Sequence, residues 1–244
     1  MYLNAYADAV RRLAENVVDG QRERIEAAGE AVADSMTRGG APLLMDTAGW
    51  LAPQVLGQPG SLMALAPLAC ELRLDNPMPL RSASRSIQAA TDLEQRTAAL
   101  ALSASYAQPG DTLIINADAG ADRKAVAMAL EAGAAGITTV GIASHARSEA
   151  ATSGHASGKM LHEAVDIAIA NGAPVGDAMV DVSGNERICP ASAMGAAMAW
   201  WAIQAAAMMQ LQARDIQPSV WRSELLGGRE IANERREIFL KKGI

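Results

Sequence analysis

The sequence has few aromatic side chains and an excess of negative charge. Phe, Trp and Tyr make up 3% of its 244 residues, which leaves few rings on which nucleic acid bases could stack. The formal net charge is −6, and an acidic balance disfavours a phosphate backbone or an anionic membrane as the main partner. We therefore expect neither a nucleic acid nor a membrane partner.

Cysteine and histidine are also scarce. Cys70 and Cys189 lie far apart without metal-site spacing, which predicts two buried thiols in a reduced, cytoplasmic protein. His145, His155 and His162 form neither a His-x-x-x-His pair nor a cluster with cysteine, so we expect no metal. The sequence also contains no Gly-x-Gly-x-x-Gly run and no P-loop, and it therefore predicts no nucleotide cofactor. The first twenty residues lack the apolar core of a signal peptide.

One long hydrophobic run tests whether the chain is soluble. No charged residue occurs between Ile188 and Ala213, and a helix of that length would span a bilayer. The run is rich in alanine and follows an alternation of strands and helices, which favours a helix buried in the core or at a subunit interface.

Apolar periodicity predicts an α/β fold. Residues 2–18 and 21–38 repeat apolar side chains with a helical period. Short apolar runs predict strands at 41–45, 111–115, 137–143 and 165–170, and helices are expected at 91–106, 123–132 and 191–213, followed by a charged tail at 229–242. Buried strands that alternate with helices form parallel sheets. Ligands then bind outside the carboxyl ends of the strands, which directs attention to 46–50, 116–123, 144–159 and 171–177.

Two of these segments resemble a known family. Residues 153–180, SGHASGKMLHEAVDIAIANGAPVGDAMV, and the strand–loop–helix–strand at 109–144 resemble the SIS (sugar isomerase) domain, in particular an uncharacterised bacterial, phosphosugar isomerase-like branch. The likeness covers roughly residues 4–233. It implies a flavodoxin-like three-layer αβα sandwich with a central parallel sheet. Residues 1–40 would be a helical N-terminal extension and 41–244 one SIS-type unit. It also implies a homo-oligomer, a dimer or tetramer, with the sugar site at the subunit boundary.

Two ligand loops depart from the pattern that this resemblance implies. SIS proteins carry a Ser-x-Ser-Gly run that holds a sugar phosphate at a helix N-terminus, whereas residues 117–120 read Ala-Asp-Ala-Gly. A carboxylate at Asp118 would repel a phosphate dianion. The branch usually carries Gly-Thr-Gly-His-Ser-His where residues 46–50 read Asp-Thr-Ala-Gly-Trp. The losses indicate either a ligand without phosphate or a site that no longer functions. Phosphate binding through backbone amides alone stays open.

Glu94 and His155 are the candidates for proton transfer, which aldose–ketose isomerisation requires between neighbouring carbons. The resemblance implies a glutamate base, and Glu94 stands where it could match; the alternative is an acid favoured by the helix dipole. It also implies a histidine for ring opening, and His155 either fills that role or caps a helix that starts near Gly158. His145 and His162 are weaker candidates: His145 follows a strand and could line the pocket, whereas His162 is expected on the surface.

Other residues that follow the predicted strands are candidates for ligand binding. Asn116, Asp118 and Asn171 would bind sugar hydroxyls. Trp50 would place its ring against a sugar, or else fill the old site. The remaining members of this candidate set are Thr47, Gly120, Ser144, Asp177 and Ser192. For the last two, turn chemistry and helix N-capping are the alternatives.

Two functions follow from these observations. The first is a carbohydrate-derivative-binding SIS protein that isomerises a sugar or sugar phosphate by proton transfer. The second is a non-catalytic sugar-binding or regulatory protein whose phosphate loops have degenerated. Both take a small sugar or sugar derivative and further copies of this chain as partners, and the sequence leaves open whether the protein is an enzyme.

Overall fold

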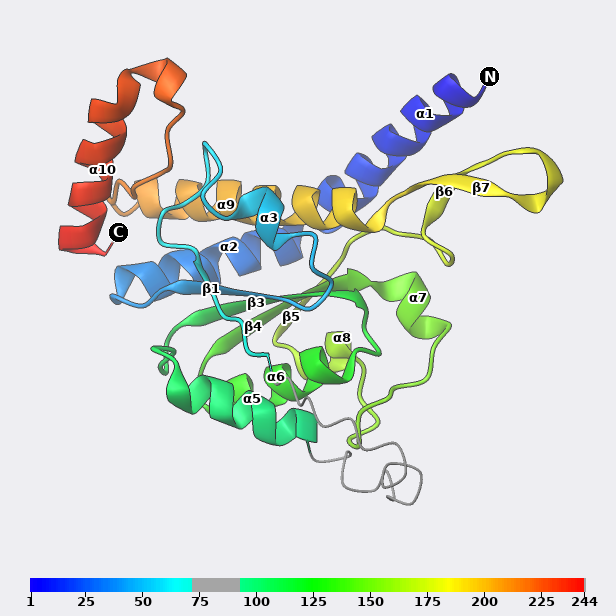
Figure 1. Ribbon diagram of the computed structural model, residues 1–244, viewed down its shortest axis with the longest axis horizontal. Coiled ribbons are helices and arrows are strands. Elements are labelled where there is room, and N and C mark those ends of the chain that lie inside the picture. Colours follow the sequence, from blue (N-terminus) through cyan, green and yellow to red (C-terminus); the bar gives the residue numbers. More distant parts are fainter. Residues whose placement is uncertain (72–92, 244) are drawn as a thin grey trace, which may run out of the picture.

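A central parallel sheet organises the chain (Figure 1). The structure, a computed structural model, describes residues 1–71 and 93–243. The main sheet contains β1 (Pro42–Asp46), β2 (Ala66–Pro67), β3 (Thr112–Ala119), β4 (Thr138–Ser144) and β5 (Ile167–Ala170). Its order is β2-β1-β3-β4-β5, and every neighbouring pair is parallel. This is the strand order of flavodoxin-like folds, in which β2 lies on one side of β1 and the later strands follow one another on its other side.

Helices cover both faces of this sheet, which confirms the predicted three-layer α/β architecture. The helices in chain order are α1 (Tyr2–Ala14), the π-helix η1 (Glu15–Asp19), α2 (Arg22–Thr37), α3 (Ala52–Val55), α5 (Leu93–Ala104), α6 (Arg123–Ala134), α7 (His145–Glu149), α8 (Leu161–Ala164), α9 (Ser192–Gln212) and α10 (Gly228–Lys242), with short 3-10 turns η3 (Ser183–Asn185) and η4 (Glu224–Leu226). In Figure 1, α2 and α9 lie on one face, and α5, α6 and α8 on the other.

The sheet separates two hydrophobic clusters. The first cluster lies between the sheet and the helices α2 and α9. It contains the side chains of β3 and β4 that point to this face, such as Ile114 and Ile142. The cluster under α5 and α6 contains the alternate residues Leu113 and Ile115. This alternation follows from the two-residue period of a strand, which sends successive side chains to opposite faces. Nearly continuous burial of β3 agrees with a parallel sheet covered on both sides.

The charge-free run forms α9, which confirms the expected buried helix. It packs along α2, and Gly29 makes this contact possible because a Cβ at that position would lie 2.5 Å from the Ala206 Cβ. Trp200, the largest fully buried side chain, anchors the same cluster. Within the described residues, no helix is both long and apolar enough to cross a membrane.

Several elements differ from the sequence prediction. The second predicted strand does not end at Ile115; β3 continues to Ala119, with an irregularity in its pairing after Asn116. An antiparallel hairpin of β6 (Ala178–Asp181) and β7 (Arg187–Pro190) was not predicted, and the charged tail is the helix α10. The start of the helix expected at 91–106 lies outside the described residues. The thiols are not both buried: Cys70 is exposed and Cys189 is half-buried.

Candidate functional site

A polar cluster closes the carboxyl ends of β1 and β3. The Asn116 amide donates to Asp46 Oδ1 at 2.7 Å, and the backbone N–H groups of Gly49 and Ala52 donate to the same carboxylate at 3.0 and 2.8 Å. Thr47 donates through its backbone N–H and its hydroxyl to the Asn116 carbonyl. Asp46 therefore orders the loop at 46–52, and two predicted ligand residues, Thr47 and Asn116, contact each other there. Asn116 is fully buried and its Oδ1 has no hydrogen-bond donor within the described residues.

The loop after β3 has its anion-binding groups occupied from within the chain. Asp118 forms a bidentate ion pair with the guanidinium of Arg147 on α7. The backbone N–H of Gly120 donates to Ser148 Oγ at 2.8 Å. Asp122 caps α6 and accepts from the first-turn N–H groups of Lys124 and Ala125. The sequence pointed to Asp118 as a carboxylate that would repel a phosphate dianion, but in the structure Arg147 balances its charge.

An open cleft of about 590 Å³ lies beside this loop. Its lining comes from the end of β1, the segment 68–71, the first turns of α5 and α6, and the loop that holds Thr152 and Gly154. Of the predicted site residues, Thr47 and Glu94 line it. Glu94 is half-buried and accepts from Arg123 Nη2 at 3.0 Å across the cleft wall.

Among the described lining residues, the cleft contains more acids than bases. The acidic lining residues are Asp46, Glu71, Glu94 and Asp122, and the basic ones are Arg123 and Lys124. Arg123 is paired with Glu94, whereas the described residues place no ion-pair partner at the Lys124 ammonium. The electrostatic character of this cleft therefore differs from that of a phosphate site, in which donors and cations predominate.

His155 lies next to the cleft loop but is held by other side chains. Its Nε2 is 3.1 Å from Gln95 Oε1, and its Nδ1 accepts from the backbone N–H of Ser157 at 3.1 Å. With Nδ1 as the acceptor, Nε2 is the ring nitrogen that can donate to Gln95. The Gln95 amide continues the chain to Glu131. His155 in this arrangement fastens the loop at 153–159 to α5, and it does not cap a helix near Gly158, because α8 begins at Leu161.

The other predicted residues lie at the start of α9 or at the carboxyl ends of β4 and β5. Asp177 accepts from Ser192 Oγ at 2.5 Å and from its backbone N–H at 2.8 Å. Asn171 is buried and accepts from the Ala173 N–H, while the Ser144 hydroxyl donates to the Ala173 carbonyl. These contacts shape the turn between β5 and β6 and the entry to α9, and none of the four predicted side chains lines the cleft.

Trp50 is also turned toward the protein interior. It is half-buried and packs against the cluster formed by α2 and α9, and its ring nitrogen is buried without a hydrogen-bond partner in the described chain. It is absent from the cleft lining. The structure therefore places the Trp50 ring against the core and not in the cleft.

The two remaining histidines meet at a separate cleft of about 520 Å³ beside β5. The His145 and His162 ring centroids are 5.2 Å apart, and His162 Nδ1 is buried, so His162 is not the surface residue that was expected. Burial first, and then the charges of His162 and Arg24, hold the pKa of His145 below its ordinary value. Glu149 acts in the opposite direction.

Sequence reasoning missed the residues that give the cleft its character. Arg123 and Lys124 open the helix after β3, and their place in the first turn after a strand was the available signal. Arg147, Gln95 and Cys70 gave no signal, because each comes close only through the tertiary fold. The described residues contain no group of three or more His, Cys, Asp or Glu side chains that could hold a metal ion.

Comparison with known proteins places this arrangement in a family. The model of the SIS domain matches residues 5–144. A UPF0309 protein of Streptomyces griseus subsp. griseus is 32% identical over 229 residues, which cover 91% of this chain and 88% of the relative. A UPF0309 protein of Streptomyces coelicolor is 30% identical, with 96% and 91% covered.

Among solved structures, a phosphoheptose isomerase from Francisella tularensis is similar at 14% identity and a TM-score of 0.48, covering 85% of this chain and 95% of that one. These values are too low to carry an argument about chemistry. The family model and the two curated relatives carry the assignment instead: the chain belongs to the SIS domain family.

Proposed function

We propose that this protein binds a sugar derivative in the cleft at the carboxyl ends of β1 and β3, and isomerises it by proton transfer. The observation that carries the proposal is the position of Glu94, a half-buried carboxylate on the cleft wall opposite the sheet. It lies where α/β sheets bind their ligands. Membership of the SIS (sugar isomerase) domain family supports the same class of reaction.

Glu94 is the group available for proton transfer, and His155 is its neighbour in the structure. Gln95, which follows Glu94 on α5, is the residue that holds His155. A substrate in the cleft would meet the Glu94 carboxylate directly, and Arg123 would orient that carboxylate through their ion pair. For His155 to act in ring opening, its hydrogen bond to Gln95 would have to give way to one with the substrate.

The experiment is proton exchange in D₂O. The protein would be incubated with aldoses and ketoses, with and without a phosphate, and deuterium at the carbon next to the carbonyl would be measured by NMR. We expect incorporation that Glu94→Gln reduces by at least a hundredfold, since general base catalysis contributes about 10²–10⁴-fold. Glu163→Gln, a carboxylate on α8 outside the cleft lining, is the matched control and should retain activity. If Glu94→Gln and His155→Ala both leave exchange intact, the mechanism is wrong.

The second candidate, a non-catalytic sugar-binding or regulatory protein, is favoured by the occupied groups at the site. Both ring nitrogens of His155 and the Glu94 carboxylate already have partners within the chain. In that case sugars bind without any exchange of deuterium, and the Glu94→Gln variant binds them as well as the native protein does.

We also propose that the protein forms a homo-oligomer. The free end of α1 projects from the body of the molecule in Figure 1, and Met1, Tyr2 and Leu3 on it are exposed apolar side chains. Sedimentation velocity on the native protein and on a Leu3→Glu variant tests this; a native monomer at every concentration would contradict it.

A further inference from the structure

A second, mainly apolar cavity adjoins the polar cleft. This cavity has a volume of about 170 Å³ and shares four lining residues with the cleft. The shared residues are Met45, Cys70, Glu94 and Lys124. A ligand that contacts these four side chains from the cleft therefore lies next to the cavity.

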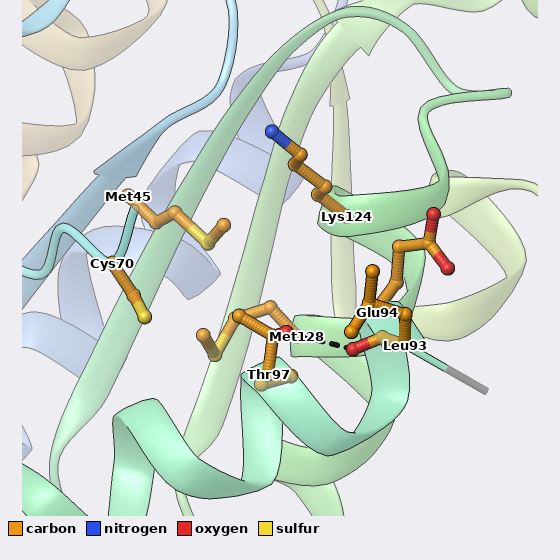
Figure 2. A pocket seen from close by; sticks show the side chains of 8 residues that line it. Met45, Cys70, Leu93, Glu94, Thr97, Lys124 and Met128 are labelled. Carbon is orange, nitrogen blue, oxygen red and sulfur yellow. Dashed lines mark hydrogen bonds between the residues drawn. The ribbon is translucent and has the colours of Figure 1, made fainter. Parts of the chain in front are cut away.

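Sulfur and aliphatic side chains form the inner part of the cavity. Figure 2 shows Met45, Cys70 and Met128 around it, with the charged groups of Lys124 and Glu94 directed away from Met128. Met128 and Ala98 are 2% and 4% exposed, so the floor of the cavity is part of the core under α5 and α6.

The hydroxyl in this cavity is already satisfied. Thr97 Oγ1 donates to the Leu93 carbonyl at 2.7 Å, as drawn in Figure 2. The inner part of the cavity consequently offers a ligand no free hydroxyl donor from Thr97, whose oxygen can still accept. Methionine side chains adapt their shape to irregular apolar groups.

The size of the cavity sets the size of its occupant. An apolar cavity of about 150 Å³ engineered in another protein holds one benzene molecule. At about 170 Å³, this cavity has room for roughly six carbon atoms by the same comparison. It exceeds the needs of a single methyl group and is too small for a long lipid chain.

The part of the ligand that stays in the cleft has little to gain from a phosphate. The Gly120 N–H, the Lys124 and Ala125 N–H groups and the Arg147 guanidinium are engaged by Ser148, Asp122 and Asp118, which leaves the Lys124 ammonium as the cation of the described lining without an ion-pair partner. Among the described lining residues, carboxylates outnumber cations. A dianion would displace these internal contacts and would meet Asp46 and Asp122 at close range.

We infer that the ligand is a sugar derivative without phosphate that carries a short aliphatic acyl or alkyl substituent. This inference rests on the proposed sugar-binding function. Its hydroxyls lie in the cleft beside Thr47 and Glu94, and its substituent enters the cavity between Met45 and Met128. The cavity thereby selects the substituent, while the occupied anion donors select against phosphorylated sugars.

The experiment uses probes without any sugar, so that its outcome is independent of which sugar binds. The n-alkanols from ethanol to hexanol and the corresponding n-alkyl phosphates would be titrated into the native protein. Binding would be followed by the methyl NMR signals of ¹³C-labelled methionine, with Met45 and Met128 assigned from Met→Leu variants. We expect both signals to move and the affinity of the alkanols to rise by roughly three- to fourfold per methylene. The phosphates should bind no more tightly than alcohols of the same length.

A cavity-filling variant provides the matched comparison. Ala98→Leu places extra volume in the cavity and should abolish the dependence on chain length, whereas Ala99→Leu, the next residue of α5 and outside this cavity, should retain it. Should Ala98→Leu fail to fold, the titration of the native protein still decides. Affinity that does not depend on chain length, or unmoved Met45 and Met128 signals, would refute the claim that the cavity binds an aliphatic substituent. Alkyl phosphates that bind tenfold more tightly than the alcohols would refute the claim that the ligand lacks a phosphate. A sugar screen that fails while the alkanol series succeeds would instead count against the proposed function.

Discussion

Gly195 allows α9 to begin directly against the turn after β5, and replacing it should have a large cost. A Cβ at Gly195 would lie 1.8 Å from the carbonyl oxygen of Asn171, a backbone atom that cannot rotate away. Overpacking of this kind costs about 1–3 kcal/mol, and a contact this short belongs at the upper end. Because alanine is favoured over glycine in helices by about 1 kcal/mol, Gly195→Ala should lose a net free energy of unfolding of about 2 kcal/mol.

Gly133 in α6 provides the control, because a Cβ there meets nothing within 4 Å. Gly133→Ala should therefore show the helix preference alone and gain about 1 kcal/mol. In a chain of this length each kcal/mol moves the melting midpoint by about 2–4 °C. Differential scanning calorimetry should place Gly195→Ala roughly 4–8 °C below and Gly133→Ala roughly 2–4 °C above the native protein. Equal midpoints for the two variants would refute the close approach of α9 to Asn171.

Three further predictions concern charge and capping. The pKa of His145 is held below its ordinary value of 6.5, so the unfolded chain binds the proton more readily and the free energy of unfolding should fall as pH drops below 6.5. Urea unfolding between about pH 5 and 8 should show a flatter dependence of stability on pH for His145→Gln. The same dependence in the variant and the native protein would contradict the lowered pKa. Asp122→Gly should cost only a few tenths of a kcal/mol of stability, yet it frees the N–H groups of Lys124 and Ala125. In calorimetric titrations, inorganic phosphate should therefore bind this variant more tightly than it binds the native protein. Equal affinity would count against an occupied anion site. A double-mutant cycle on the half-exposed pair of Asp118 and Arg147 should give a coupling of about 0.2–1 kcal/mol, and zero coupling would contradict a stabilising role for the pair.

The fold was predictable because its signals are local. The helical period of α1 and α2 and the apolar runs of β1, β3, β4 and β5 are visible in the chain, as is the uncharged stretch that forms α9. The prediction ended β3 too early, because Asn116 and Asp118 read as loop residues although both continue the strand. Whether a polar residue can continue a buried strand depends on the side chain that pairs with it. Here the pairing residues are Asp46 for Asn116 and Arg147 for Asp118, and both come from distant segments.

The candidate site was only partly predictable for the same reason. Glu94 and Thr47 were singled out from the sequence and both line the cleft. His155, however, is bound to Gln95 from another element, and Trp50 turns into the core. Position along the chain shows which loops meet at the sheet edge, but the direction in which each side chain points depends on contacts that only the folded structure contains.

The most direct test of the account is a thermal-shift screen with pairs of sugars that differ only in a phosphate. A ligand at ~100 times its dissociation constant adds about 2.7 kcal/mol of stability, which corresponds to roughly 5–10 °C. We expect sugars without phosphate to raise the midpoint, and we expect Thr152→Trp on the cleft rim to abolish the shift while Ala156→Trp, outside the lining, does not. No shift with any sugar, or an undiminished shift in Thr152→Trp, would contradict a sugar site in this cleft.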